Sequence, residues 1–353
     1  MDEVFKQAIE SYPYPIAYKI KLSVAIDIRV EPRKKLDQIL DTAEEIAKFI
    51  GAAAVLELIN YCKDNRDYSL PGSIKNNFKN KIIKPSFGNW IQLGRDGFKF
   101  LSEQDKKVAI ENLQGVYYKS NGRASEFQEA VNELNQMRNN FGHEVDKVKL
   151  TKKKYAGIAR IALNLLKQMV AEINFLANVS FGYIETIELK KSKRDAPKYL
   201  YKGKELKGRE FIKETTGLLS DQVYYHYKET NAVVIKFEAE KNYLNLFPFY
   251  IYDEDHGDAS DIFIYSSANN AKMNEIKYLG CAYGGTLKLE KNKRQPKQNS
   301  TACQEIIDGP TNGEISDNWR DIVDGKAMGQ DNSEDDLNNL VREELKHILN
   351  TIT

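Results

Sequence analysis

The chain of 353 residues contains only three cysteines, Cys62, Cys281 and Cys303. They lie far apart and none belongs to a Cys-x-x-Cys pair, which argues against a disulfide framework and a cysteine-based zinc site and favours a reducing environment. The sequence also lacks any apolar run long enough to span a bilayer. Its first residues, MDEVFKQAIESYPYP, lack the basic start and apolar stretch of a secretory signal. We therefore expect a cytoplasmic protein that does not contact a membrane.

Charge of either sign is not in excess overall, but it is unevenly distributed. The chain has 52 Lys and Arg against 51 Asp and Glu, a formal net charge of +1. Residues 301–353 hold twelve acidic and four basic residues, a net of −8, so residues 1–300 carry +9. A mildly basic body with an acidic tail suits contact with nucleic acid, with the tail as a shield or a partner-binding segment. The alternative is that both charges serve only solubility, because no stretch of the body is densely basic.

Apolar residues recur at helical spacing through the first half of the chain. They predict a long amphipathic helix over 34–64, with Gly51 inside it as a kink or a close helix crossing. A second helix is predicted over 86–101, with Phe87 and Trp90 in the core, and a third over 124–140. The segment 154–179 is the most apolar, and its stripe, which includes Ile158, Ile161 and Leu165, is typical of a central bundle helix. Short connections between these segments predict a helical bundle over residues 1–180.

The periodicity changes from helical to alternating after residue 180. Val233, Ile235 and Phe237 alternate with Lys236 and Glu238, which is the pattern of a half-buried strand. Similar short segments, rich in Tyr, Val, Ile and Phe and separated by turn residues, continue to residue 291. They predict a small antiparallel sheet or barrel as a second domain over 181–291. The predicted fold class is therefore α+β.

A linker and one further helix complete the predicted organisation. Residues 292–332 are acidic, rich in Asn, Asp, Gly and Pro, and have no periodicity, which predicts a disordered linker. Residues 333–353 form an amphipathic helix that cannot bury its apolar face by itself. It either docks back on the body or binds a protein partner in a groove. The residues that we predict for partner binding share the apolar face: Leu337, Val341, Leu345 and Ile348.

Arg138 and His143 are the candidate catalytic pair. On a continuous helix, residues five apart lie about 140° around the axis and do not converge. Asn139, Asn140 and Gly142 are poor helix formers, so we expect the helix to end near Asn140 and His143 to turn back toward Arg138. A guanidinium would then hold a scissile phosphate while an imidazole moves protons, without a metal. Chance alone also produces such a pair readily, and both residues then serve only as polar surface.

The context of this pair resembles a known family. MRNNFGHE, directly before a long apolar helix, resembles the Arg-Asn-x-x-x-His motif of the HEPN superfamily of α-helical bundles. The segments YPYPIAYKI and KPSFGNWIQLGRD resemble a HEPN-like module of bacterial signalling and defence proteins, and NYLNLFPFYIYD resembles a strand of the β-domain that follows it there. The resemblance covers residues 12–290. It implies that Arg138 binds the phosphate, His143 acts as acid and base, Asn139 orients the backbone or substrate, and the protein is a homodimer.

Two functions of different classes follow. The first is a sensor or adaptor of a bacterial antiphage-defence or signalling system, which acts through dimerisation and through ligand or partner binding. The second is a metal-independent endoribonuclease that uses Arg138 and His143. RNA is a possible partner in either case, and the basic loop residues Lys190, Lys191, Lys193 and Arg194 are the predicted phosphate contacts. We predict no cofactor and no metal site, because the acidic segment 253–261 lacks the spacing of a calcium-binding loop.

Overall fold

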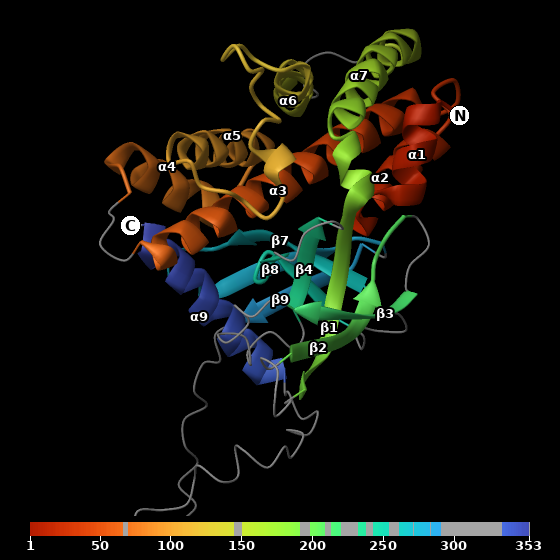
Figure 1. The fold of residues 1–353 in the computed structure, drawn as a ribbon. Coiled ribbons are helices and arrows are strands. Elements are labelled where there is room, and N and C mark those ends of the chain that lie inside the picture. Colours follow the sequence, from red (N-terminus) through yellow and green to blue (C-terminus); the bar gives the residue numbers. More distant parts are fainter. Residues whose placement is uncertain are drawn as a thin grey trace, which may run out of the picture.

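Helices form the first half of the structure and an antiparallel sheet most of the second half (Figure 1). The computed structural model describes residues 1–65, 70–144, 150–190, 198–208, 213–219, 232–237, 243–253, 261–270, 272–282, 284–290 and 334–352. The predicted linker, 292–332, lies outside these residues. The α+β fold class is confirmed. In the described parts of the chain, no helix is long and apolar enough to cross a bilayer.

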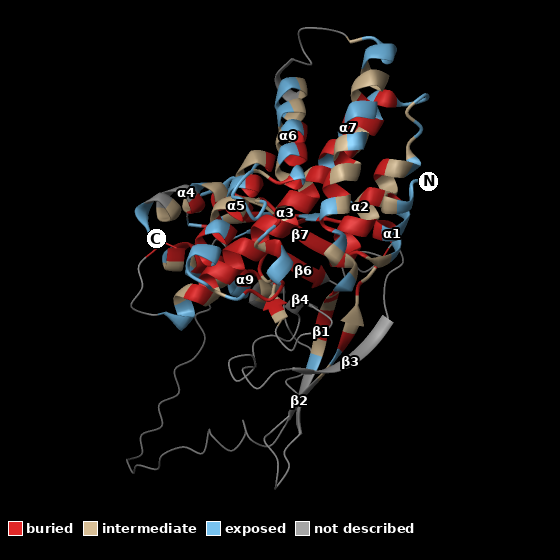
Figure 2. Ribbon diagram, turned by 45° about the horizontal axis from the view of Figure 1, so that its top comes forward, coloured by how far each residue is buried: buried red, intermediate tan, exposed pale blue. Residues whose placement is uncertain are grey.

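The first half folds into a run of helices arranged around one long central member. Their bounds are α1 (Glu3–Ser11), α2 (Tyr14–Ala25), α3 (Pro32–Asp64), α4 (Gly72–Ile83), α5 (Phe87–Glu103), α6 (Glu126–Glu144) and α7 (Lys152–Glu172), with short 3-10 helices at Glu111–Leu113 and Asn174–Asn178. The centre of the molecule is α3, which is buried along most of its length (Figure 2). The helix predicted over 154–179 ends earlier, because the chain passes through the second 3-10 helix into a strand at Val179.

Gly51 marks a close crossing between α3 and α5. A Cβ atom at this position would lie 2.8 Å from the carbonyl oxygen of Trp90 and 2.9 Å from its ring. Only glycine allows the two backbones to approach so closely. Trp90 and Phe87 are both buried, which confirms that they belong to the core.

The described strands form one nine-stranded antiparallel sheet. Its order is β3-β2-β1-β4-β6-β7-β8-β9, and β5 pairs with β4. The strand bounds are β1 (Val179–Lys190), β2 (Lys198–Glu205), β3 (Lys213–Leu219), β4 (Ala232–Phe237), β5 (Tyr243–Asn245), β6 (Tyr250–Asp253), β7 (Asp261–Ala268), β8 (Glu275–Gly280) and β9 (Thr286–Glu290). Among these strands, β3 and β9 are the two edges and do not pair with each other. Of the two predicted arrangements, sheet or barrel, the described strands therefore form an open sheet.

The helices and the sheet share one hydrophobic core rather than forming two separate cores. The ring of Phe49 on α3 lies 6.3 Å from that of Phe181 on β1 and 6.0 Å from that of Tyr250 on β6. The Tyr265 hydroxyl on β7 donates to the carbonyl oxygen of Ile82 on α4, at 2.8 Å. The parts predicted as domains 1–180 and 181–291 are therefore two layers of one folded unit.

The C-terminal helix α9 (Glu334–Ile352) docks on this unit, beside the edge strand β9 (Figure 1). Asn338 Nδ2 donates to the carbonyl oxygen of Glu290, and Arg342 Nη2 donates to that of Leu289, both at 2.7 Å. These bonds satisfy main-chain acceptors that an edge strand would otherwise expose.

The docking of α9 corrects the prediction of a partner-binding face. Val341, Leu345 and Ile348 are fully buried, and Leu337 packs half-buried against the same core. The physical reason is that the helix finds a complementary apolar surface within its own chain. Of the two alternatives that the sequence left open, the structure adopts docking on the body.

Candidate functional site

The helix that carries Arg138 does not end where the sequence predicts. Instead of stopping near Asn140, α6 continues through both asparagines and Gly142 to Glu144. The Phe141 ring lies 6.3 Å from the ring of Tyr155 on α7, and this contact holds the last turn in helical form. The positions of Arg138 and His143 therefore stay about 140° apart around the axis. The predicted turn that brings His143 back toward Arg138 is wrong; the His143 side chain lies outside the described part of the structure.

Arg138 forms ion pairs with two carboxylates on α3. Its Nη1 lies 3.0 Å from Oδ1 of Asp41, and its Nη2 lies 2.8 Å from Oε2 of Glu44. Desolvation raises the pKa of Glu44, and the Arg138 charge opposes this shift. Both ends of the guanidinium are thus engaged in holding α6 on α3. A phosphate would have to displace two carboxylates to reach it. Asn139, the third predicted catalytic residue, is exposed.

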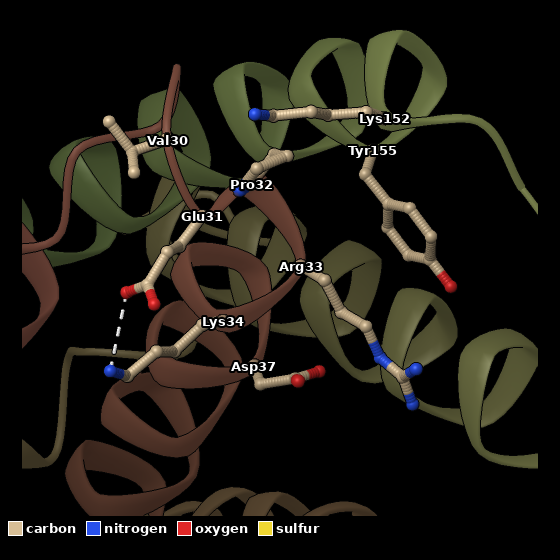
Figure 3. Close-up of a pocket in the computed structure, with 8 residues that line it drawn as sticks. All are labelled: Val30, Glu31, Pro32, Arg33, Lys34, Asp37, Lys152 and Tyr155. Atoms are coloured by element: carbon tan, nitrogen blue, oxygen red, sulfur yellow. Dashed lines mark ion pairs between the residues drawn. The ribbon is translucent and has the colours of Figure 1, made fainter.

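A hollow of about 510 Å³ lies between the start of α3 and the start of α7 (Figure 3). Basic, acidic and apolar side chains line it: Arg33, Lys34, Lys152, Glu31, Asp37, Val30, Pro32 and Tyr155. Arg33 and the Tyr155 hydroxyl point toward the same end of the hollow, and Lys152 extends toward the other end (Figure 3). The contact between Tyr155 and Phe141 places this hollow next to the end of α6.

The charges that line the hollow are only partly paired with one another. Lys34 Nζ lies 3.2 Å from Oε2 of Glu31. In the described part of the chain, Arg33 and Lys152 form no ion pair with a carboxylate within 4.0 Å. Desolvation raises the pKa of Asp37, and the nearby Arg33 lowers it. Arg33 and Lys152 thus line the hollow with no carboxylate of the described residues within 4.0 Å of their charged groups.

The outer flank of α7 is a second exposed feature. The sequence places α7 at the centre of the bundle, but its apolar stripe is only partly covered, because α3 takes the central position. Ile161 is 54% exposed, and Ile158 and Leu165 beside it are half-buried. Lys154 and Glu172, both exposed, continue the same flank toward the two ends of the helix.

The remaining predicted site residues are not brought to either feature. Lys191, Lys193 and Arg194 lie outside the described residues, and Lys190 ends β1 with its side chain outside them as well. Within the described ranges no group of His, Cys, Asp and Glu side chains could hold a metal ion. Cys281 is buried, and burial raises the pKa of its thiol well above the usual value, so it is a core residue and not a nucleophile.

Comparison of the chain with protein-family models, with curated proteins and with solved structures finds no match. The resemblance to HEPN bundles therefore stays a prediction that rests on the sequence motifs.

The sequence contains no pattern that predicts the hollow. Arg33 and Lys152 begin two helices that are far apart in the chain, and no local motif connects them. Only the packing of α3 against α7 places both around the same hollow.

Proposed function

We propose that this protein is a sensor or adaptor that works as a homodimer and binds partners or ligands without catalysing a reaction. The bacterial defence or signalling setting comes with the resemblance of its sequence to HEPN modules. The observation that carries the proposal is the apolar stripe of α7, which is exposed at Ile161 and half-buried at Ile158 and Leu165. An apolar stripe that continues along an accessible helix face is a candidate interaction site.

The flank has the spacing of a helix-pairing seam. Its residues recur at alternating intervals of four and three, as in the core positions of a coiled coil: Lys154, Ile158, Ile161, Leu165, Gln168 and Glu172. This pattern keeps all six positions on one side of a helix. The half-covered state of Ile158 and Leu165 leaves the seam accessible along α7.

The occupant that fits this seam is the same helix of a second copy. If two α7 helices pair antiparallel about a two-fold axis near Leu163, Ile161 faces Leu165 of the partner subunit. The same register places Lys154 opposite Glu172 of the partner subunit, and symmetry repeats this pair at the other end. Such self-complementarity is what an isologous dimer contact requires.

The ion pairs of Arg138 favour a sensor or adaptor over a ribonuclease. A ribonuclease of the predicted type needs a guanidinium that is free to hold a phosphate, with an imidazole close to it. Here the guanidinium is shared between Asp41 and Glu44, and α6 runs unbroken past Asn140. We therefore expect Arg138 to act in holding the helices together.

Sedimentation velocity of the full chain tests the dimer. We expect a reversible dimer that Ile161→Glu weakens at least about tenfold, because it places two carboxylates in an apolar seam. Lys154→Glu should weaken it about threefold to tenfold, and the double change Lys154→Glu with Glu172→Lys should restore it. Leu279→Glu, at an exposed apolar position on β8, is the matched control and should leave the dimer intact. A monomer at about 100 µM, or the failure of the double change to restore pairing, would contradict the proposed seam.

An RNA incubation in the presence of EDTA tests the catalytic alternative. We expect intact RNA at high protein concentration. Metal-independent cleavage that His143→Ala abolishes would replace the adaptor by the ribonuclease.

A further inference from the structure

We propose that the hollow between the starts of α3 and α7 binds the phosphate group of a small phosphorylated molecule. No motif of the sequence points to this site. It arises because the starts of α3 and α7 line one open volume of about 510 Å³, with Arg33 and the Tyr155 hydroxyl at one end and Lys152 at the other (Figure 3). A volume of this size accommodates a ligand larger than inorganic phosphate alone.

Two basic side chains of the hollow are available to bind an anion. Arg33 and Lys152 face the hollow with no carboxylate paired to them among the described residues, whereas Lys34 is occupied by Glu31. A guanidinium matches two oxygens of a phosphate with parallel hydrogen bonds. The Tyr155 hydroxyl, which points to the same end of the hollow, can donate a further hydrogen bond to a third oxygen (Figure 3).

The main chain at the start of α3 also offers hydrogen-bond donors. Glu31 is the N-cap residue of this helix, but its side chain accepts no capping hydrogen bond. The N–H groups of Arg33 and Lys34 in the first turn have no intrahelical acceptor, as in any α-helix, and the Glu31 side chain does not replace it. In contrast, the Thr151 hydroxyl at the start of α7 accepts from the Lys154 N–H at 3.3 Å. The uncapped turn of α3 adds main-chain donors to the charged side chains that line the hollow.

The other residues that line the hollow indicate which kind of molecule the phosphate group is attached to. Pro32 and the Tyr155 ring offer apolar surface, and Asp37 places a carboxylate beside Arg33. This carboxylate opposes anions at the Arg33 end, a polyanion more strongly than a single phosphate, and it accepts hydrogen bonds from hydroxyls. This combination fits a phosphate monoester of a polyhydroxylated molecule, such as a sugar phosphate, better than a polyanion.

The site is separate from the proposed dimer seam. Tyr155 and Ile161 lie about 120° apart around α7, so the hollow faces α3 while the seam faces outward. A change in one is not expected to alter the other, and each proposal can fail alone.

Titration calorimetry of the full chain tests the site with glucose 6-phosphate, inorganic phosphate and glucose as probes. We expect glucose 6-phosphate to bind more tightly than phosphate, and glucose to give no signal at about 10 mM. Arg33→Ala should weaken binding of glucose 6-phosphate at least about tenfold, and Tyr155→Phe about threefold. Lys288→Ala removes an exposed cation of β9 and is the matched control, with unchanged affinity expected.

Either of two results with these small probes would overturn the proposal. One is the absence of binding by both phosphorylated probes at about 10 mM, and the other is equal affinity in the Arg33→Ala variant. A 5′-phosphorylated RNA oligonucleotide separates the sources of the phosphate: binding of that oligonucleotide alone would contradict a small-molecule ligand. Sedimentation of Arg33→Ala alongside the wild type shows whether the dimer persists, which keeps this outcome distinct from that of the proposed function.

Discussion

At the scale of single residues, Glu57 is the acid that burial perturbs most clearly. Its carboxylate lies within the core on α3 and accepts the N–H of Ala109 at 2.7 Å. Desolvation raises its pKa from 4.5 to about 7. The folded state therefore holds this proton more tightly than the unfolded state does. Stability is lost as the pH rises from about 4.5 through 7, by roughly 3 kcal/mol in total.

Replacement of Glu57 by glutamine tests this dependence. The amide keeps an oxygen that accepts from Ala109 but does not ionise, so the loss of unfolding free energy between about pH 5 and 8 should shrink by roughly 3 kcal/mol. Urea unfolding at several pH values measures it. Glu343→Gln, at an exposed position on α9, should leave the dependence unchanged. Parallel stability curves for the wild type and Glu57→Gln would show that burial does not perturb this acid.

For the candidate catalytic residues, the sequence predicts which residues are notable but not which contacts they make. Arg138 is conspicuous in the sequence, but its ion pairs with Asp41 and Glu44 depend on how α6 lies on α3. Asn139, Asn140 and Gly142 predict a helix end from local propensity alone. The tertiary contact between Phe141 and Tyr155 overrides that propensity.

At the scale of elements, the crossing of α3 and α5 depends on one absent side chain. Gly51→Ala would place a methyl group against the carbonyl oxygen of Trp90, and neither backbone can move away without disturbing the core. We expect a loss of about 1–3 kcal/mol in unfolding free energy. Gly157→Ala is the control, because nothing lies within 4 Å of its added Cβ. In the middle of α7 this change should stabilise the protein by about 0.5–1 kcal/mol. Chemical denaturation of both variants gives the comparison, and a neutral Gly51→Ala would disprove the close crossing.

The periodicity of apolar residues predicts that a helix or strand exists better than it predicts where that element lies in the fold. The spacing of apolar residues predicts the long helix α3 and the strands after residue 180. It also assigns the most apolar segment, α7, to the centre of the bundle, and this is wrong. An apolar stripe indicates that one face of a helix packs against another surface. It does not indicate whether that surface belongs to a neighbouring helix or to another copy of the chain. Sequence alone does not separate these cases for Ile158, Ile161 and Leu165.

At the scale of the whole molecule, the helical layer and the sheet depend on each other. The buried ring of Tyr250 on β6 contacts Phe49 and Phe181, and its hydroxyl lies 3.3 Å from Oε1 of Glu45 on α3. The sequence gives no sign of these contacts, because Glu45 and Phe49 lie about two hundred positions from Tyr250. The change in periodicity near residue 180 is therefore a change of element type within one unit. Unfolding should be a single cooperative transition.

The helix α9 belongs to the same cooperative unit, and its interior face provides the sharpest test. Leu345 is fully buried, so Leu345→Asp would place a carboxylate in the core without a partner. We expect α9 to detach, the unfolding free energy to fall by several kcal/mol, and the amides of α9 to lose protection against hydrogen exchange. Leu340→Asp changes a residue of the same helix that is 37% exposed, and should alter neither quantity appreciably. If α9 instead served chiefly to bind a partner, its amides would exchange rapidly in the wild type and Leu345→Asp would cost little stability.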